Sequence, residues 1–131
     1  MIEEALAAKL LATSGVTALT STRIWPAGSV QAEGADRELV YVTFERISGA
    51  PHYDHGGESG LQRARVELMA HAPSYGQAKA LGEALRAALS GWSETQSKIT
   101  VGHCLIVANE DLYDPELRQQ LNATDFECLY S

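Results

Sequence analysis

The stretch that decides the fold reads LQRARVELMAH at residues 61–71, then APS at 72–74, then YGQAKALGEALRAAL at 75–89. In residues 61–71 apolar and polar side chains alternate. One face carries Ala64, Val66, Leu68 and Ala70, and the other carries Arg63, Arg65 and Glu67. A period of two predicts a strand, and one polar face favours antiparallel pairing, because such a sheet buries only one side.

Residues 74–89 change to the period of a helix. Ser74 and Gln77 have the spacing of a capping box at its start. We expect Gly91 to end this helix and Trp92 to fold back onto the core. The predicted apolar stripe consists of Ala78, Leu81, Leu85, Ala88 and Leu89.

Upstream, residues 39–47 predict another strand, with Val40, Val42 and Phe44 on one face. Residues 49–60 separate the two strands and contain four glycines and one proline. This composition predicts a long, mobile hairpin tip.

At the N-terminus, residues 2–13 predict a helix because apolar residues recur at intervals of four. We expect Gly15 to end this helix and residues 16–19 to pack over its end. Residues 21–37 have no regular period and predict a loop, with a short strand at residues 23–25.

Residues 99–107 and 119–130 predict two more strands, joined by turn residues at 109–115. The chain, residues 1–131, is then a single α+β domain. We expect one antiparallel four-stranded sheet made of two β-hairpins, with two helices packed on one face, because this arrangement buries every apolar stripe.

The two cysteines, Cys104 and Cys128, are too few for a disulfide framework. If the last hairpin turns near Tyr113, Cys104 lies opposite Ala123 and Thr124, four or five residues short of Cys128. At about 3.3 Å per residue, that offset exceeds the reach of a disulfide. We expect free, half-buried thiols.

The composition excludes several classes of protein. Hydrophobic residues make up 45% and charged residues 21%, which is typical of a globular domain. With 17 acidic and 10 basic side chains, the net charge of −7 opposes binding to a phosphate backbone. No apolar run approaches the roughly 20 residues of a membrane span. Glu3 and Glu4 stand where a signal peptide would be basic, so we expect synthesis in a cytoplasm and no membrane contact.

One cluster has the residue types of a metal site. His52, Tyr53, Asp54 and His55 are consecutive, and Glu58 follows. Imidazole nitrogens and carboxylates are zinc ligands. The glycines beside them favour instead a solvated hairpin tip, because ligands need rigid support.

Other reactive patterns are absent from the sequence. It has neither a glycine-spaced nucleophile elbow nor a phosphate-binding glycine loop. Asp111, Asp114 and Glu116 form an acidic run near a turn, as solvated residues often do. Arg63 and Arg65 share an exposed strand face, which is typical either of an ordinary wet surface or of a contact between subunits. The residues predict no catalytic centre, no metal and no cofactor.

Several short features follow one another in order along the whole chain. They are an Ala/Leu-rich first helix, Gly15-Val16, Arg23-Ile24-Trp25-Pro26, Leu39-Val40-Tyr41, Ile47-Ser48-Gly49, Ser59-Gly60-Leu61, Arg63-Ala64-Arg65-Val66, Leu85-Arg86-Ala87-Ala88-Leu89, Leu112-Tyr113-Asp114-Pro115 and Asp125-Phe126. In this order they resemble the tail terminators, also called tail-completion or tail-to-head joining proteins, of long-tailed bacteriophages and gene-transfer particles. Gln119-Gln120 stand where this family leads us to expect more basic residues.

The resemblance implies a ring, usually of six copies, on the end of the tail tube. Such a ring stops tube polymerisation and gives the neck of the filled head a docking surface. The implied partners are further copies of the chain, the major tail tube protein and the neck or stopper protein. The implied location is the neck region of the virion tail, after synthesis in the bacterial host cytoplasm. DNA would pass through the lumen without specific binding, because each subunit carries a net −7.

We expect the hairpin tip at residues 51–60 and the loop at residues 25–37 to meet the tube and the neck, since long loops are common devices for meeting a partner. The candidate contact residues are Trp25, Pro51, His52, Tyr53, Asp54, His55, Glu58, Arg63 and Arg65.

Three alternatives stay open at this point. The first is another ring-forming neck component, an adaptor or a stopper. The second is a metal-dependent enzyme that uses His52, Asp54 and His55. The third is a host-encoded interaction domain unrelated to phage.

Overall fold

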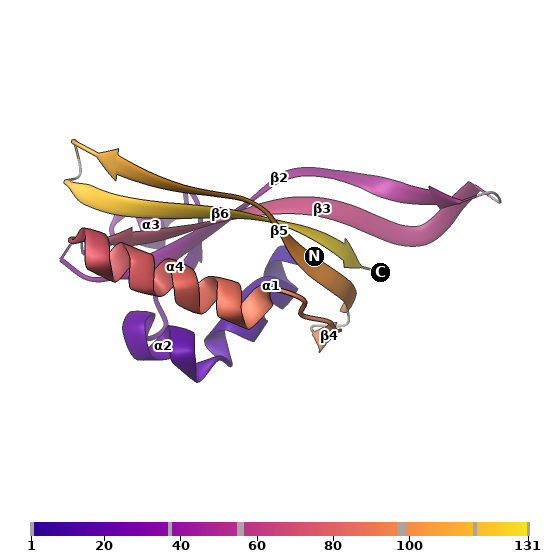
Figure 1. Ribbon diagram of the computed structural model, residues 1–131, viewed down its shortest axis with the longest axis horizontal. Helices are drawn as coiled ribbons and strands as arrows, with labels where there is room; N and C mark the ends of the chain where they lie inside the picture. The colour runs from indigo at the N-terminus through magenta and orange to yellow at the C-terminus, as the bar shows by residue number, and fades with distance from the viewer. Residues whose placement is uncertain (1, 37, 55–56, 97–98, 117, 131) are drawn as a thin grey trace.

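The computed structural model of the chain describes residues 2–36, 38–54, 57–96, 99–116 and 118–130, with residues 50–54, 57–61, 94–96 and 99 described by their backbone alone. These residues form an α+β fold in which helices pack against a six-stranded sheet of order β1-β2-β3-β6-β5-β4 (Figure 1). The helices are α1 (Ile2–Leu11), α2 (Ser14–Thr20), α3 (Val30–Glu33) and α4 (Tyr75–Leu89). The strands are β1 (Ile24–Pro26), β2 (Tyr41–Asp54), β3 (Gly57–Ala72), β4 (Glu94–Gln96), β5 (Ile99–Asp114) and β6 (Gln119–Tyr130).

The two predicted hairpins are β2–β3 and β5–β6, and antiparallel pairing of β3 with β6 joins them into one sheet. The expectation of four antiparallel strands was incomplete. Strand β1, which matches the predicted short strand at residues 23–25, pairs with β2 in parallel, and β4 pairs with the beginning of β5. Three-residue strands carry too little alternation to stand out in a sequence.

Both hairpins are longer than predicted. The segment expected to be a mobile tip is mostly paired strand, because β2 and β3 stay paired from Pro51↔Gln62 through Tyr53↔Glu58 to Asp54↔Gly57, with a register shift between Pro51 and Tyr53. Irregular pairing between Pro51 and Tyr53 accommodates the proline, and an outer strand tolerates its missing N–H. The β2–β3 hairpin therefore projects beyond the helices as an arm (Figure 1).

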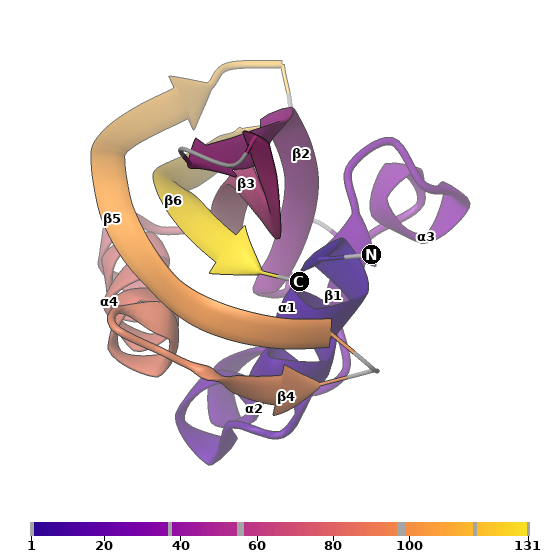
Figure 2. The same ribbon diagram turned by 90° about the vertical axis from the view of Figure 1, so that its right-hand side faces the viewer.

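The helices α1, α2 and α4 cover one face of the sheet, as expected for the two predicted helices (Figure 2). The single helix predicted at residues 2–13 is wrong in detail. Its chain leaves the helix at Leu11, Thr13 takes an extended conformation, and α2 begins at Ser14. Gly15 therefore lies inside α2 and does not end α1. The short α3 lies within the predicted loop and contributes no buried residue.

The apolar core lies between these helices and the sheet. Ala64, Val66, Leu68 and Ala70 of β3 are fully buried, as their alternation predicted. The α4 stripe is buried at Ala78, Leu81, Leu85 and Leu89, while Ala88 packs at its margin. Ser74 caps α4, Gly91 follows with φ of 74°, and Trp92 is buried as expected. In the described part of the chain, no helix has the length and apolar character that crossing a bilayer requires.

The predicted register of the last hairpin is wrong. Strand β5 continues to Asp114, which pairs with Gln119, so Cys104 lies directly opposite Cys128. Both thiols are free, as expected, but they are fully buried. A hydrogen bond with Cys128, followed by burial, raises the pKa of the Cys104 thiol.

Gly82 brings α4 close to β6, and this contact is testable. A Cβ at Gly82 would overlap the side-chain amide of Asn122, whereas a Cβ at Gly76 would meet open space. We expect Gly82→Ala to lower the free energy of unfolding by about 1–3 kcal/mol, despite the better helix propensity of alanine. The matched variant Gly76→Ala should raise it by up to about 1 kcal/mol. Urea unfolding of both variants measures the difference, and equal effects would show that α4 can move away from β6 without cost.

Candidate functional site

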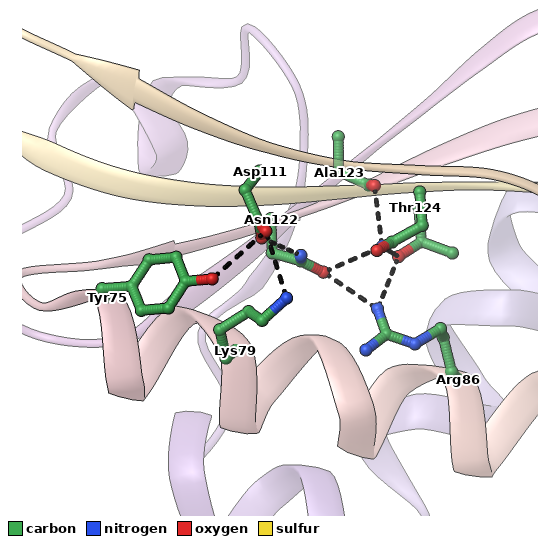
Figure 3. Close-up of polar contacts among 8 residues, drawn as sticks. Tyr75, Lys79, Arg86, Asp111, Asn122, Ala123 and Thr124 are labelled. Carbon is green, nitrogen blue, oxygen red and sulfur yellow. Dashed lines mark hydrogen bonds and ion pairs between the residues drawn. The ribbon is translucent and has the colours of Figure 1, made fainter.

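A polar network joins α4 to the second hairpin, and we call it the polar seam (Figure 3). It comprises Tyr75, Lys79 and Arg86 of α4, Asn109 and Asp111 of β5, and Asn122 and Thr124 of β6. Helical spacing places the three α4 residues on one side, over the two strands. The seam therefore lies where the amphipathic helix meets the sheet.

Asp111 is the acceptor at one end of the polar seam. Asn122 Nδ2 donates to Asp111 Oδ1 at 2.7 Å, and Lys79 Nζ lies 3.1 Å from Asp111 Oδ2. The hydrogen bond from Asn122, followed by that from Lys79, lowers the pKa of the Asp111 carboxyl. The hydrogen bond with Asp111 also raises the pKa of the Lys79 ammonium group. Asp111 therefore joins α4 and β6 as a shared hydrogen-bond acceptor.

Asn109 and Arg86 organise the other end of the polar seam. Asn109 Nδ2 donates to Thr124 Oγ1 at 2.9 Å and to Asn122 Oδ1 at 3.2 Å. Arg86 Nη1 donates to the same Asn122 oxygen at 3.0 Å and to Thr124 Oγ1 at 3.3 Å. Among the described residues, no buried side-chain polar atom lacks a hydrogen bond. A network of this kind fixes the position of β5 relative to α4.

The sheet face opposite the helices carries cross-strand charges. Arg65 donates from Nε and Nη2 to Asp125 Oδ2 at 3.0 and 2.6 Å, and Arg63 pairs with Glu127 at 3.3 Å. Glu67 lies in register with Asp125. Burial, followed by the charge of Asp125, raises the pKa of Glu67. Within one subunit both arginines thus have carboxylate partners. The exposed pair of Arg63 with Glu127 contributes little stability, whereas the partner of Arg65, Asp125, is buried.

A second cluster, which sequence reasoning missed, lies on this same face beside β1. The rings of Tyr41 and His71 stack with centroids 4.3 Å apart, and Trp25 lies 5.8 Å from Tyr41. Thr43 Oγ1 and Gln119 Oε1 lie 2.9 and 3.3 Å from the two ring nitrogens of His71. A depression of about 230 Å³ adjoins it, lined by Ala27, Gly28, Ala32, Glu33, Ala35, Tyr41, Thr43 and His71. The sequence shows only the apolar neighbours of His71 within its own strand. It does not show the contact with Gln119, because that residue is 48 positions away.

The predicted contact residues fall into separate regions. Trp25 lies on β1 opposite Thr43, near the body of the sheet, and is half-buried. Pro51, His52, Tyr53, Asp54 and Glu58 belong to the projecting arm, where only their backbone is described. His55 lies outside the described residues. From position 43 to position 51 the strand runs roughly 26 Å, so Trp25 and the arm do not form one site.

The proposed metal ligands His52, Asp54 and His55 are not tested by the structure. His55 is outside the described residues, and the side chains of the other two are not described. Among described side chains, no three metal-binding groups come together.

The His71 cluster predicts a pH dependence. Burial lowers the pKa of His71 below its usual 6.5, so the unfolded chain takes up this proton more readily than the folded one. Stability should therefore fall as the pH drops below about 6.5, by at most about 1.4 kcal/mol per pH unit. We expect the unfolding free energy of wild type minus that of His71→Gln to be constant above pH 7 and to decrease below 6.5. The raised pKa of Glu67 acts in the opposite direction at lower pH and cancels in this difference. A difference that stays constant from pH 7.5 to 5 would contradict the assignment.

The chain is similar to structural proteins of phage-like particles. The family model for "Tail completion protein gp17" matches residues 4–131. A chain of the solved "virion of native gene transfer agent (GTA) particle" is similar with a TM-score of 0.74 at 17% identity, over 96% of this chain and 91% of that chain, which shows a shared fold. No curated protein sequence matches the chain. Because the family model spans nearly the whole chain, the protein belongs to the tail completion protein gp17 family of structural virion tail proteins.

Proposed function

We propose that this protein forms a ring at the head-proximal end of the tail tube, where it ends tube polymerisation and provides the docking surface for the neck. The observation that carries the proposal is the family match over residues 4–131. The architecture supports it, because the projecting arm extends beyond the helices, where neighbours can reach it (Figure 1). In this role the chain acts within the neck region of the virion tail and catalyses no reaction.

The arm is the element that suits contact with the tube or the neck. Residues 45–54 and 57–65 pair mainly with each other, and the arm extends past the helices (Figure 1). An extended two-stranded ribbon reaches further than a compact loop of equal length, since each residue adds about 3.3 Å. We assign the contacts with tube and neck to this arm, including Pro51, His52, Tyr53, Asp54 and Glu58. Trp25 belongs to a separate contact near β1.

The charge of the chain suits a passage for DNA. A net charge of −7 per subunit gives an assembled ring a negative field that repels phosphates. Arg63 and Arg65, which an isolated strand would offer to a phosphate, are paired with Glu127 and Asp125. DNA therefore crosses the lumen without specific binding.

Deletion of the distal arm tests the role. Removing residues 51–59 joins Ala50 to Gly60 and shortens the hairpin outside the buried core, so the variant should fold. We expect particles that carry it to have overlong tails, because tube growth is no longer stopped. Electron microscopy of tail lengths measures this, with a gene knockout complemented by the full-length gene as the control.

The same microscopy separates the proposal from its rivals. Replacing residues 51–59 by nine glycine and serine residues keeps the length of the arm and removes its side chains, so it should reproduce the overlong tails. In the gene knockout, tails of normal length without heads would assign the chain to an adaptor or stopper role. If both variants give tails of normal length with heads attached, the arm does not contact the tube.

A further inference from the structure

Strand β5 has an open outer edge. Its neighbour β4 pairs only with Ile99–Val101, and Gly91 N donates to Cys104 O at 2.8 Å. Beyond Cys104, among the residues that the structure describes, no strand pairs with the outer side of residues 105–114. An unpaired edge of this length presents a row of N–H and C=O groups to another chain.

The side chains on this edge are apolar and exposed. Leu105, Ile106, Val107 and Ala108 are consecutive, and all four are exposed. Leu105 is 51% exposed, Val107 is 45% and Tyr113, further along, is 55%. Residues 105–114 contain no lysine, arginine or proline, which are the residues that usually protect an edge strand from pairing. This edge therefore has the character of an interface.

The opposite margin of the sheet has a second open edge of matching length. Strand β1 pairs with β2 only at Val42–Phe44. Past Phe44, within the described chain, no strand pairs with the outer side of residues 45–54. The open part of β2 runs into the projecting arm and the open part of β5 runs toward the other end of the molecule (Figure 1). Each open edge is ten residues long, and the two lie at opposite ends and opposite margins of one sheet.

The charges on the two edges differ. Residues 105–114 carry Glu110, Asp111 and Asp114 and no base, whereas residues 45–54 carry Glu45 and Asp54 together with Arg46. Arg46 is exposed, and its guanidinium lies close to Gly49. Two β5 edges would bring together only acidic groups. Charge thus favours β2 as the partner of β5.

We propose that the β5 edge of one copy pairs with the β2 edge of the next copy, head to tail, to extend the sheet from subunit to subunit. The two edges are different surfaces, so each copy keeps one free edge after the first contact. Such a contact closes into a ring when the rotation between copies permits it. This pairing identifies the subunit contact of the proposed ring and rests on that proposed function.

Single charges placed on each edge test the pairing. Val107→Lys blocks the β5 edge and Ile47→Lys blocks the β2 edge, and both side chains are about half exposed in the single subunit, so the fold should survive. The matched control is Val30→Lys, since Val30 on α3 is 87% exposed and away from both edges. Light scattering after size exclusion gives the mass of the purified full chain over a concentration series, and circular dichroism checks folding. If Val107→Lys is unfolded, Tyr113→Lys replaces it.

We expect wild type and Val30→Lys to form multimers of the 14.1 kDa subunit, and each edge variant alone to remain at the subunit mass. An equimolar mixture of Val107→Lys and Ile47→Lys should give a species of twice the subunit mass and nothing larger, because each protein retains one complementary edge. Dimers of Ile47→Lys alone would indicate β5–β5 pairing and overturn the proposal, as would a wild type that stays at the subunit mass. If this pattern holds while particles from the gene knockout have tails of normal length, the pairing stands and the role at the tube end fails.

Discussion

The packing of α4 against the paired strands β3 and β6 holds the rest of the structure in place. Val66 and Leu68 of β3 and Phe126 of β6 are fully buried and face the helix layer. An isolated two-stranded hairpin is only marginally stable in water. Here β2 attaches to β3 and β5 attaches to β6, so each hairpin depends on the central pair. The well-packed centre stabilises the long segments that project from it.

The polar seam limits how α4 can lie on that centre. Gly82 allows the helix backbone to approach Asn122, whose side chain contacts Arg86, Asn109 and Asp111 at once. A purely apolar contact would tolerate small shifts of the helix along the sheet, because hydrophobic burial is not directional. Hydrogen bonds are directional, so the seam selects one register among those that bury similar area. It also holds β5, whose outer edge is open, at a fixed position.

The sequence predicted the elements whose patterns are long and regular. The alternation in residues 61–71 and the capped stripe of α4 were sufficient for both elements, and strand 119–130 was predicted with its bounds. The glycines and the proline of residues 49–60 indicated a loop, because local propensity does not register pairing with a distant strand. The register of the last hairpin failed for a related reason. The turn lies after Asp114, with Arg118 at a φ of 53°, and this turn together with an irregularity between Ile106 and Ala108 sets the pairing of Cys104 with Cys128.

For the candidate site, the sequence named residues but not how they are arranged in space. The sequence indicated a surface for partners and no reactive centre, and the structure locates the arm that carries most of the named residues. The sequence did not reveal that Trp25 and the arm are separate, because their separation depends on where β1 joins the sheet. The sequence also did not reveal the exposure of Leu105, Ile106 and Val107, because a run of apolar residues is equally typical of a buried strand.

Charge places a physical condition on any assembly of this chain with itself. Copies that each carry −7 repel one another at long range, and salt screens this repulsion beyond roughly 8–10 Å. Association then depends on contacts that act only at short distance, namely backbone hydrogen bonds and apolar burial. The open edge of β5 offers both, and the edge of β2 offers the backbone groups together with Arg46. The multimers expected of the purified chain therefore require that short-range pairing outweigh the screened repulsion between copies.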